Sequence, residues 1–126
     1  MTTVIEYVAD DGTVFEYEDD CLFYEFSLYV DKYKDDILLF NDNGERMGFT
    51  CDNLREQLER CHWLIVRTNE AAAFLYDEFS DITLPWRQNE KVNAGLWTFD
   101  ENISCWISRE ELEQEFKIFN QIKGFL

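Results

Sequence analysis

The sequence predicts an α+β fold: a mostly antiparallel sheet built from hairpins, with about four helices packed on it. Runs of strand-forming residues come in pairs joined by short turn sequences, and segments with a helical period lie between the pairs. The chain has 126 residues, of which 46% are hydrophobic and 17% aromatic, enough for a real core. With one proline and no linker or repeat, residues 1–126 are predicted to form a single acidic domain.

The first elements are predicted to be a hairpin and a long helix. Residues 3–8 and 13–15 favour strands, and Asp11-Gly12 between them is a strong turn signal. From Tyr17 to Lys34 apolar residues recur every three or four positions, which indicates one broad helical face. We expect that face to be formed by Leu22, Phe23, Phe26, Tyr29, Val30 and Tyr33.

A second hairpin and a short helix should follow. Residues 37–40 and 46–49 flank Asn43-Gly44, which again favours a tight turn. Residues 52–61 have the spacing of a short helix. The continuous apolar run 63–66 is typical of a central strand that is buried on both faces.

The next stretch combines a third helix with an irregular segment. Residues 70–79 favour a helix that is capped by Thr68 or Asn69. Residues 82–94 contain Pro85 and several polar residues, so we expect a loop there.

The C-terminal part predicts a third hairpin and a final helix. Residues 96–99 and 103–107 are strand-like, and Asp100-Glu101-Asn102 lies between them. Ser108 and Glu111 have the spacing of a capping box, which marks a helix start. Its apolar positions are Leu112, Phe116, Phe119 and Ile122.

The cysteines and the termini exclude several classes of site. The cysteines are at positions 21, 51, 61 and 105, so no CxxC pair occurs, and His62 is the only histidine. A zinc site is therefore disfavoured, and no cofactor is predicted. Two disulfides are compatible with the even count, but the sequence opens without a signal peptide. We expect reduced, mostly buried thiols in a cytoplasmic protein.

No motif indicates an enzyme. His62 could pair with Cys51 or Ser104, but neither pairing has support in the sequence, and a packing role for His62 is the simpler interpretation. Oxygen-rich groups at Asp10-Asp11 and Asp42-Asn43 are accounted for by hairpin turns. We therefore predict no catalytic and no metal-binding residues.

Charge is the most informative feature. The net charge is -16, and residues 1–36 contribute -9 of it while residues 87–126 contribute only -2. Such a balance disfavours direct binding to nucleic acid or to an anionic membrane, and it favours a basic protein partner. The predicted partner-binding residues are Asp10, Asp11, Glu16, Glu18, Asp19, Asp20, Glu25, Asp31, Asp35 and Asp36.

An acidic surface of this kind can occupy a groove lined with Lys and Arg and displace DNA or RNA from it. Exposed aromatic side chains such as Tyr17 or Tyr24 would add contact energy. The alternatives are that the charge only keeps a monomer or small homo-oligomer in solution, or that the protein is a non-catalytic adaptor. An adaptor would bind its partner through an apolar or aromatic patch.

The segment from Tyr7 to Phe15, YVADDGTVF, together with Glu18-Asp19-Asp20-Cys21 and Tyr24-Glu25, resembles the start of many small acidic phage and prophage proteins. In these, a DGT-x-F hairpin leads into an acidic helix. The resemblance implies an inhibitor of the anti-CRISPR or nucleic-acid-mimic kind. It implies as partner a basic host protein, with a CRISPR effector nuclease such as Cas9 as one candidate.

Overall fold

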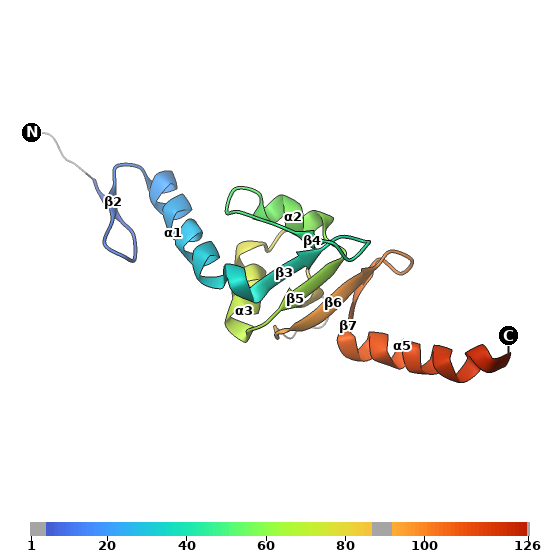
Figure 1. Ribbon diagram of the computed structural model, residues 1–126. Helices are drawn as coiled ribbons and strands as arrows, with labels where there is room; N and C mark the ends of the chain where they lie inside the picture. Colours follow the sequence, from blue (N-terminus) through green and yellow to red (C-terminus); the bar gives the residue numbers. More distant parts are fainter. Residues whose placement is uncertain (1–4, 87–91, 126) are drawn as a thin grey trace, which may run out of the picture. The chain divides into compact units, whose positions relative to one another are not determined.

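The computed structural model describes residues 5–86 and 92–125 and confirms the α+β class (Figure 1). Its described residues form four α-helices, a two-stranded sheet and a five-stranded antiparallel sheet. They divide into an N-terminal unit, residues 1–34, and a C-terminal unit, residues 35–126.

The N-terminal unit is the predicted hairpin followed by the predicted helix. Strands β1 (Tyr7–Val8) and β2 (Val14–Phe15) pair antiparallel, and α1 spans Glu18–Tyr33. Gly12 has a φ of 89°, a left-handed conformation that glycine adopts without strain, and its N–H donates to the carbonyl of Ala9 at 2.9 Å. The first four residues of the chain, which include part of the predicted first strand, lie outside the described residues.

The predicted apolar face of α1 is mostly not buried. Only Cys21 and Val30 of the helix are buried, whereas Leu22 and Phe23 are 54% and 52% exposed. The hairpin strands have two residues each, so they offer too little surface to cover a helix of 16 residues. Phe26 and Tyr33 are half-buried.

The C-terminal unit is built on the five-stranded sheet, with strand order β4-β3-β5-β6-β7 and every neighbouring pair antiparallel. This arrangement confirms the second and third predicted hairpins, and Gly44 supplies the positive φ of 78° at the second turn. The strands are β3 (Ile37–Phe40), β4 (Arg46–Met47), β5 (Trp63–Val66), β6 (Gly95–Asp100) and β7 (Cys105–Ser108).

Strand β5 is central, as predicted, but it is fully buried on one face only. Leu64 and Val66 are buried, whereas Trp63 and Ile65 on the opposite face are half-buried. Because Leu39 pairs with Leu64 in the register of β3 and β5, its side chain lies on the buried face as well. The alternation shows why a run of four apolar residues does not by itself prove burial on both faces.

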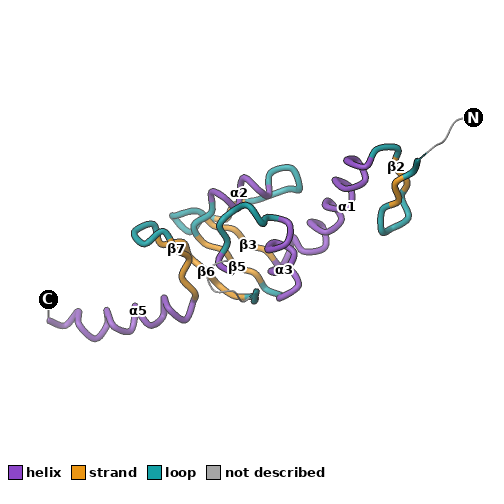
Figure 2. Tube along the Cα trace, turned by 180° about the vertical axis from the view of Figure 1, so that it is seen from behind, coloured by secondary structure: helices purple, strands orange, loops and turns teal. Residues whose placement is uncertain are grey.

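Helices α2 (Leu54–Arg60) and α3 (Asn69–Glu78) confirm the two short helices and connect successive strands of the sheet (Figure 2). Thr68 is the cap of α3, and its Oγ1 accepts from the N–H of Ala71 at 3.1 Å. The core contributions of α2 are Leu54 and Leu58, which are buried.

The segment predicted as a loop, 82–94, contributes three large apolar side chains to the core. Ile82, Leu84 and Trp86 are buried, and Trp86 is 0% exposed. The indole Nε1 of Trp86 donates to the carbonyl of Asn93 at 2.7 Å, which satisfies its polar atom. Residues 87–91 of the predicted loop lie outside the described residues.

The last helix, α5 (Arg109–Ile122), begins where the capping box predicted. Ser108 Oγ accepts from the N–H of Glu111 at 3.3 Å. None of the residues in α5 is buried, and a short 3-10 turn, η2 (Lys123–Phe125), follows it. Among the described helices, none has the length and apolar character needed to cross a membrane.

Candidate partner-binding site

In the N-terminal unit the acidic hairpin is attached to α1 by side-chain hydrogen bonds. Tyr24 Oη donates to Asp11 Oδ2 at 2.5 Å, and Asp11 Oδ1 accepts from the N–H of Thr13 at 3.0 Å. These two bonds favour the ionised carboxyl group and lower the pKa of Asp11 below its ordinary value. The rings of Phe15 and Tyr24, 5.1 Å apart, add an apolar contact at the same place.

A second set of bonds fixes Asp10 in the same way. Tyr29 Oη donates to Asp10 Oδ2 at 3.1 Å, and the N–H of Asp10 donates to Glu25 Oε1 at 3.1 Å. The bond to the Asp10 carboxylate and its negative charge raise the pKa of Tyr29. The carboxylates of Asp10, Asp11 and Glu25 therefore lie together, around a hollow of about 260 Å³ that is completed by Leu28, Tyr29 and Lys32.

The remaining predicted acids of this unit are exposed. Glu16 precedes α1, Glu18, Asp19 and Asp20 form its first turn, and Asp31 lies near its end. Within the described part of the N-terminal unit, the ion pair formed is that of Lys34 with Asp31, at 3.9 Å. Its nine acidic and two basic residues give residues 1–34 a net charge of -7. Most of this charge is displayed to solvent rather than neutralised within the unit.

Asp35 and Asp36 belong to the C-terminal unit instead. Arg67 donates to the backbone carbonyls of both: its side-chain Nη1 donates to Asp35, and its backbone N–H donates to Asp36. These contacts join the segment before β3 to the end of β5. The structure thus divides the ten predicted acids between two units, and it brings Asp10, Asp11 and Glu25 together.

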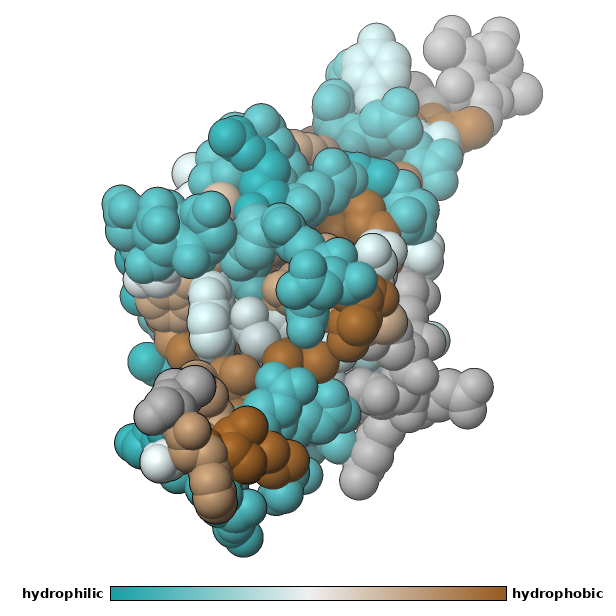
Figure 3. All heavy atoms as spheres, turned by 90° about the vertical axis from the view of Figure 1, so that its right-hand side faces the viewer, coloured by the Kyte–Doolittle hydropathy of each residue, from teal (hydrophilic) through white to brown (hydrophobic). Residues whose placement is uncertain are grey.

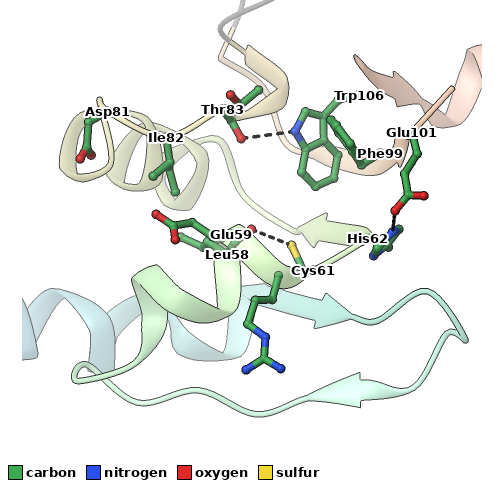
Figure 4. A pocket seen from close by; sticks show the side chains of 11 residues that line it. Leu58, Glu59, Cys61, His62, Asp81, Ile82, Thr83, Phe99, Glu101 and Trp106 are labelled. Carbon is green, nitrogen blue, oxygen red and sulfur yellow. Dashed lines mark hydrogen bonds and ion pairs between the residues drawn. The ribbon is translucent and has the colours of Figure 1, made fainter. Parts of the chain in front are cut away.

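A larger pocket of about 440 Å³ lies in the C-terminal unit, and its lining includes Cys61 and His62, which makes it a second candidate for a functional site (Figure 4). His62 Nε2 lies 2.7 Å from Glu101 Oε1 at one side of it, so the histidine pairs with a carboxylate of the β6–β7 turn. Trp106 and Phe99 pack edge to face on the same side, with ring centroids 5.5 Å apart.

Cys61 does not supply a nucleophile to this pocket. Its side chain is buried, and its Sγ–H donates to the carbonyl of Leu58 at 3.3 Å. Burial raises the pKa of the thiol to about 12, so the thiolate, the reactive form, is absent near neutral pH. His62 is directed toward Glu101 and away from the sulfur (Figure 4).

All four cysteines carry free thiols in the structure, Cys21 and Cys61 buried, Cys51 and Cys105 half-buried. Across residues 5–86 and 92–125, no three side chains of His, Cys, Asp or Glu come close enough together to hold a metal ion. The oxygen-rich turns are occupied by local hydrogen bonds. For example, Asn41 Oδ1 accepts from the N–H groups of Asn43 and Glu45.

Comparisons with known proteins add no relative to this picture. The chain matches no protein-family model, and no curated protein or solved structure is significantly similar to it.

Two side-chain contacts at these sites were not predicted from the sequence. Tyr24 was expected to be an exposed contact residue, but it is half-buried and bonded to Asp11, whereas Tyr17 is 67% exposed. The pairing of His62 with Glu101 was not expected either. The two contacts join residues that are 13 and 39 positions apart, and no short-range pattern predicts such pairs.

Proposed function

We propose that this protein is a stoichiometric inhibitor that binds a basic, nucleic-acid-handling host protein through its acidic N-terminal unit. The observation that carries the proposal is the net charge of -7 on 34 residues, most of it on exposed carboxylates. A basic channel attracts such a surface at long range and binds it at the sites that nucleic acid would otherwise occupy.

The arrangement of the carboxylates supports this function beyond their number. Asp10 and Asp11 are held by tyrosine hydroxyl groups, so their positions relative to α1 are fixed before a partner arrives. The first turn of α1 adds the exposed residues Glu18, Asp19 and Asp20, which spread negative charge around the N-terminal end of the helix because consecutive positions do not share a face.

The hollow between Asp10, Asp11 and Glu25 suits a lysine or arginine side chain of the partner. Its lining has three acidic residues against one basic residue, Lys32, and Leu28 and Tyr29 offer apolar surface for the aliphatic part of such a side chain. A CRISPR effector nuclease such as Cas9, with its positively charged nucleic-acid channel, is the candidate target to test first.

The test compares two variants of equal charge. In the first, Glu16→Gln, Glu18→Gln, Asp19→Asn and Asp20→Asn neutralise exposed acids of the N-terminal unit. In the control, Asp42→Asn, Glu45→Gln, Asp77→Asn and Glu78→Gln neutralise exposed acids of the C-terminal unit. Inhibition of target-DNA cleavage by Cas9 and 1:1 binding to it are measured at low and high salt.

We expect the first variant to bind roughly tenfold more weakly or worse and to lose much of its salt dependence, while the control behaves as wild type. Equal losses in both variants, or inhibition that is indifferent to both, would show that the N-terminal acids are not the binding surface. A wild-type protein that neither binds nor inhibits the nuclease would exclude this target.

The adaptor function is the second candidate, and exposed apolar side chains of the same unit favour it. Tyr17, Leu22 and Phe23 are each more than half exposed. If they carry the binding, Phe23→Ser weakens it at every salt concentration, and the four-acid variant binds as wild type. The two functions thus predict opposite responses in one experiment.

A further inference from the structure

Helix α5 exposes apolar side chains in a regular pattern. Phe116, Phe119 and Ile122 are 58%, 55% and 57% exposed, and Leu112 is half-buried at the start of the helix. Their spacing of four, three and three residues places them on one side of the helix, here called the α5 stripe. The space-filling view, which faces the C-terminal end of the chain, shows brown apolar side chains exposed among teal polar ones (Figure 3).

The charges of α5 are segregated along its length. The first half carries Glu110, Glu111, Glu113 and Glu115, with Arg109 bonded to Glu113 at 2.8 Å. After Glu115 the helix and η2 carry lysines, at 117 and 123, and the sequence to the end contains no acid. One end of the helix is therefore acidic and the other basic.

This separation of charge along α5 indicates which kind of partner can pack on the α5 stripe. An anionic lipid surface would meet four glutamates on a helix whose net charge is negative. A second α5 in antiparallel orientation instead places each acidic half beside a basic half, and it places the two stripes face to face. A parallel pair would put like charges together.

We propose that the α5 stripe is a self-association surface, on which a second copy of this chain packs its own α5 antiparallel. The interface is isologous, so one helix supplies both of its halves and the contact closes as a dimer. A helix of 14 residues is about 21 Å long. Two helices of this length bury an area at the small end of the range for specific protein interfaces, so the dimer should dissociate on dilution. The proposal is independent of the target bound by the N-terminal unit.

The first experiment measures the mass of the purified full chain by sedimentation equilibrium over a wide concentration range. We expect a monomer–dimer equilibrium for wild type and a monomer throughout for Phe119→Glu. The control is Gln114→Glu, which adds the same charge on the side of α5 opposite the stripe and should dimerise as wild type. Both positions are exposed, and circular dichroism verifies that the variants keep their helices.

The second experiment tests the orientation. Glu115→Lys places a lysine in the acidic half of α5, and Lys123→Glu places an acid in η2 after its basic half, so each variant reduces the charge difference along this segment. In an antiparallel pair each variant alone should dimerise several-fold more weakly at low salt, and an equimolar mixture should regain the wild-type affinity.

Three results would overturn the proposal. These are a wild-type monomer at every concentration, a Phe119→Glu protein that dimerises as well as wild type, and association that grows without reaching a dimer limit. Charge variants that associate as wild type, alone and mixed, would contradict the antiparallel orientation.

Discussion

In the C-terminal unit, Leu39 and Leu64 of neighbouring strands are 0% exposed, whereas Leu22 of the N-terminal unit is 54% exposed on a well-formed helix. The C-terminal unit is held by packing within and around a sheet of five strands. The N-terminal unit relies on hydrogen bonds from Tyr24 and Tyr29 to two aspartates. The difference shows that one chain can combine an apolar core with a small unit whose shape depends on charged and polar contacts.

The largest expected effect comes from the same substitution made in each unit. Leu64→Ala leaves a cavity in the centre of the sheet and should lower the free energy of unfolding by about 2–5 kcal/mol. Leu22→Ala should change it by about 0.5 kcal/mol or less, because the side chain is already mostly in water. Urea unfolding measures both. Equal losses would mean that Leu22 is buried in solution and that the contrast between the units is wrong.

Alkaline pH should weaken the C-terminal unit through Cys61. Its pKa is raised from 9.0 to about 12, so the folded state keeps a proton that the unfolded state loses. This contribution to stability is complete below pH 9 and falls by about 1.4 kcal/mol per pH unit as the pH rises from 9 towards 12.

The measurement is the free energy of unfolding between pH 8 and pH 10.5 for wild type and Cys61→Ala. The variant should lack this part of the decline, although it starts from a lower stability. Parallel pH curves for the two proteins would rule out a buried, protonated thiol at this position.

Acid should loosen the N-terminal unit. The pKa of Asp11 is lowered below 3.8 in the folded unit, so its stabilising effect is present above pH 3.8 and is lost as the pH falls through the lowered value. Amide hydrogen exchange at Thr13, whose N–H donates to Asp11, should accelerate in that range before the sheet of the other unit is affected. In Asp11→Asn the same amide should show no acid-dependent step.

The smallest expected effect is that of Tyr24→Phe. It removes one hydroxyl group, keeps the ring beside Phe15, and should raise the exchange rate of the hairpin amides without changing the unfolding midpoint of the C-terminal unit. Tyr76→Phe in α3 is the matched control. A lower midpoint for Tyr24→Phe would show that the two units do not respond separately.

The sequence predicted most of the elements because their signals are local. Asp11-Gly12 and Asn43-Gly44 mark turns, and Ser108 marks a helix start, each within a few residues. What it could not predict depends on partners far along the chain. The exposure of Leu22 follows from the shortness of the hairpin strands, and the burial of Trp86 from the surrounding core.

The candidate site was also predicted only in part. The concentration of acids in the first quarter of the chain is visible in the sequence, but the grouping of Asp10, Asp11 and Glu25 is not. That grouping depends on a helix packing against a hairpin, with Tyr29 reaching a residue 19 positions away. Asp35 and Asp36 were assigned to the same surface because they are near in sequence, although the boundary between the units precedes them.

The aromatic residues are also divided between the units, and this gives each an optical signal of its own. All four tryptophans, including the buried Trp86, lie in the C-terminal unit, and five of the six tyrosines lie in residues 1–34. Tryptophan fluorescence therefore reports the C-terminal unit, and tyrosine absorbance reports mainly the N-terminal unit. Unfolding of either unit can be followed in the unmodified protein, without a label and without cutting the chain.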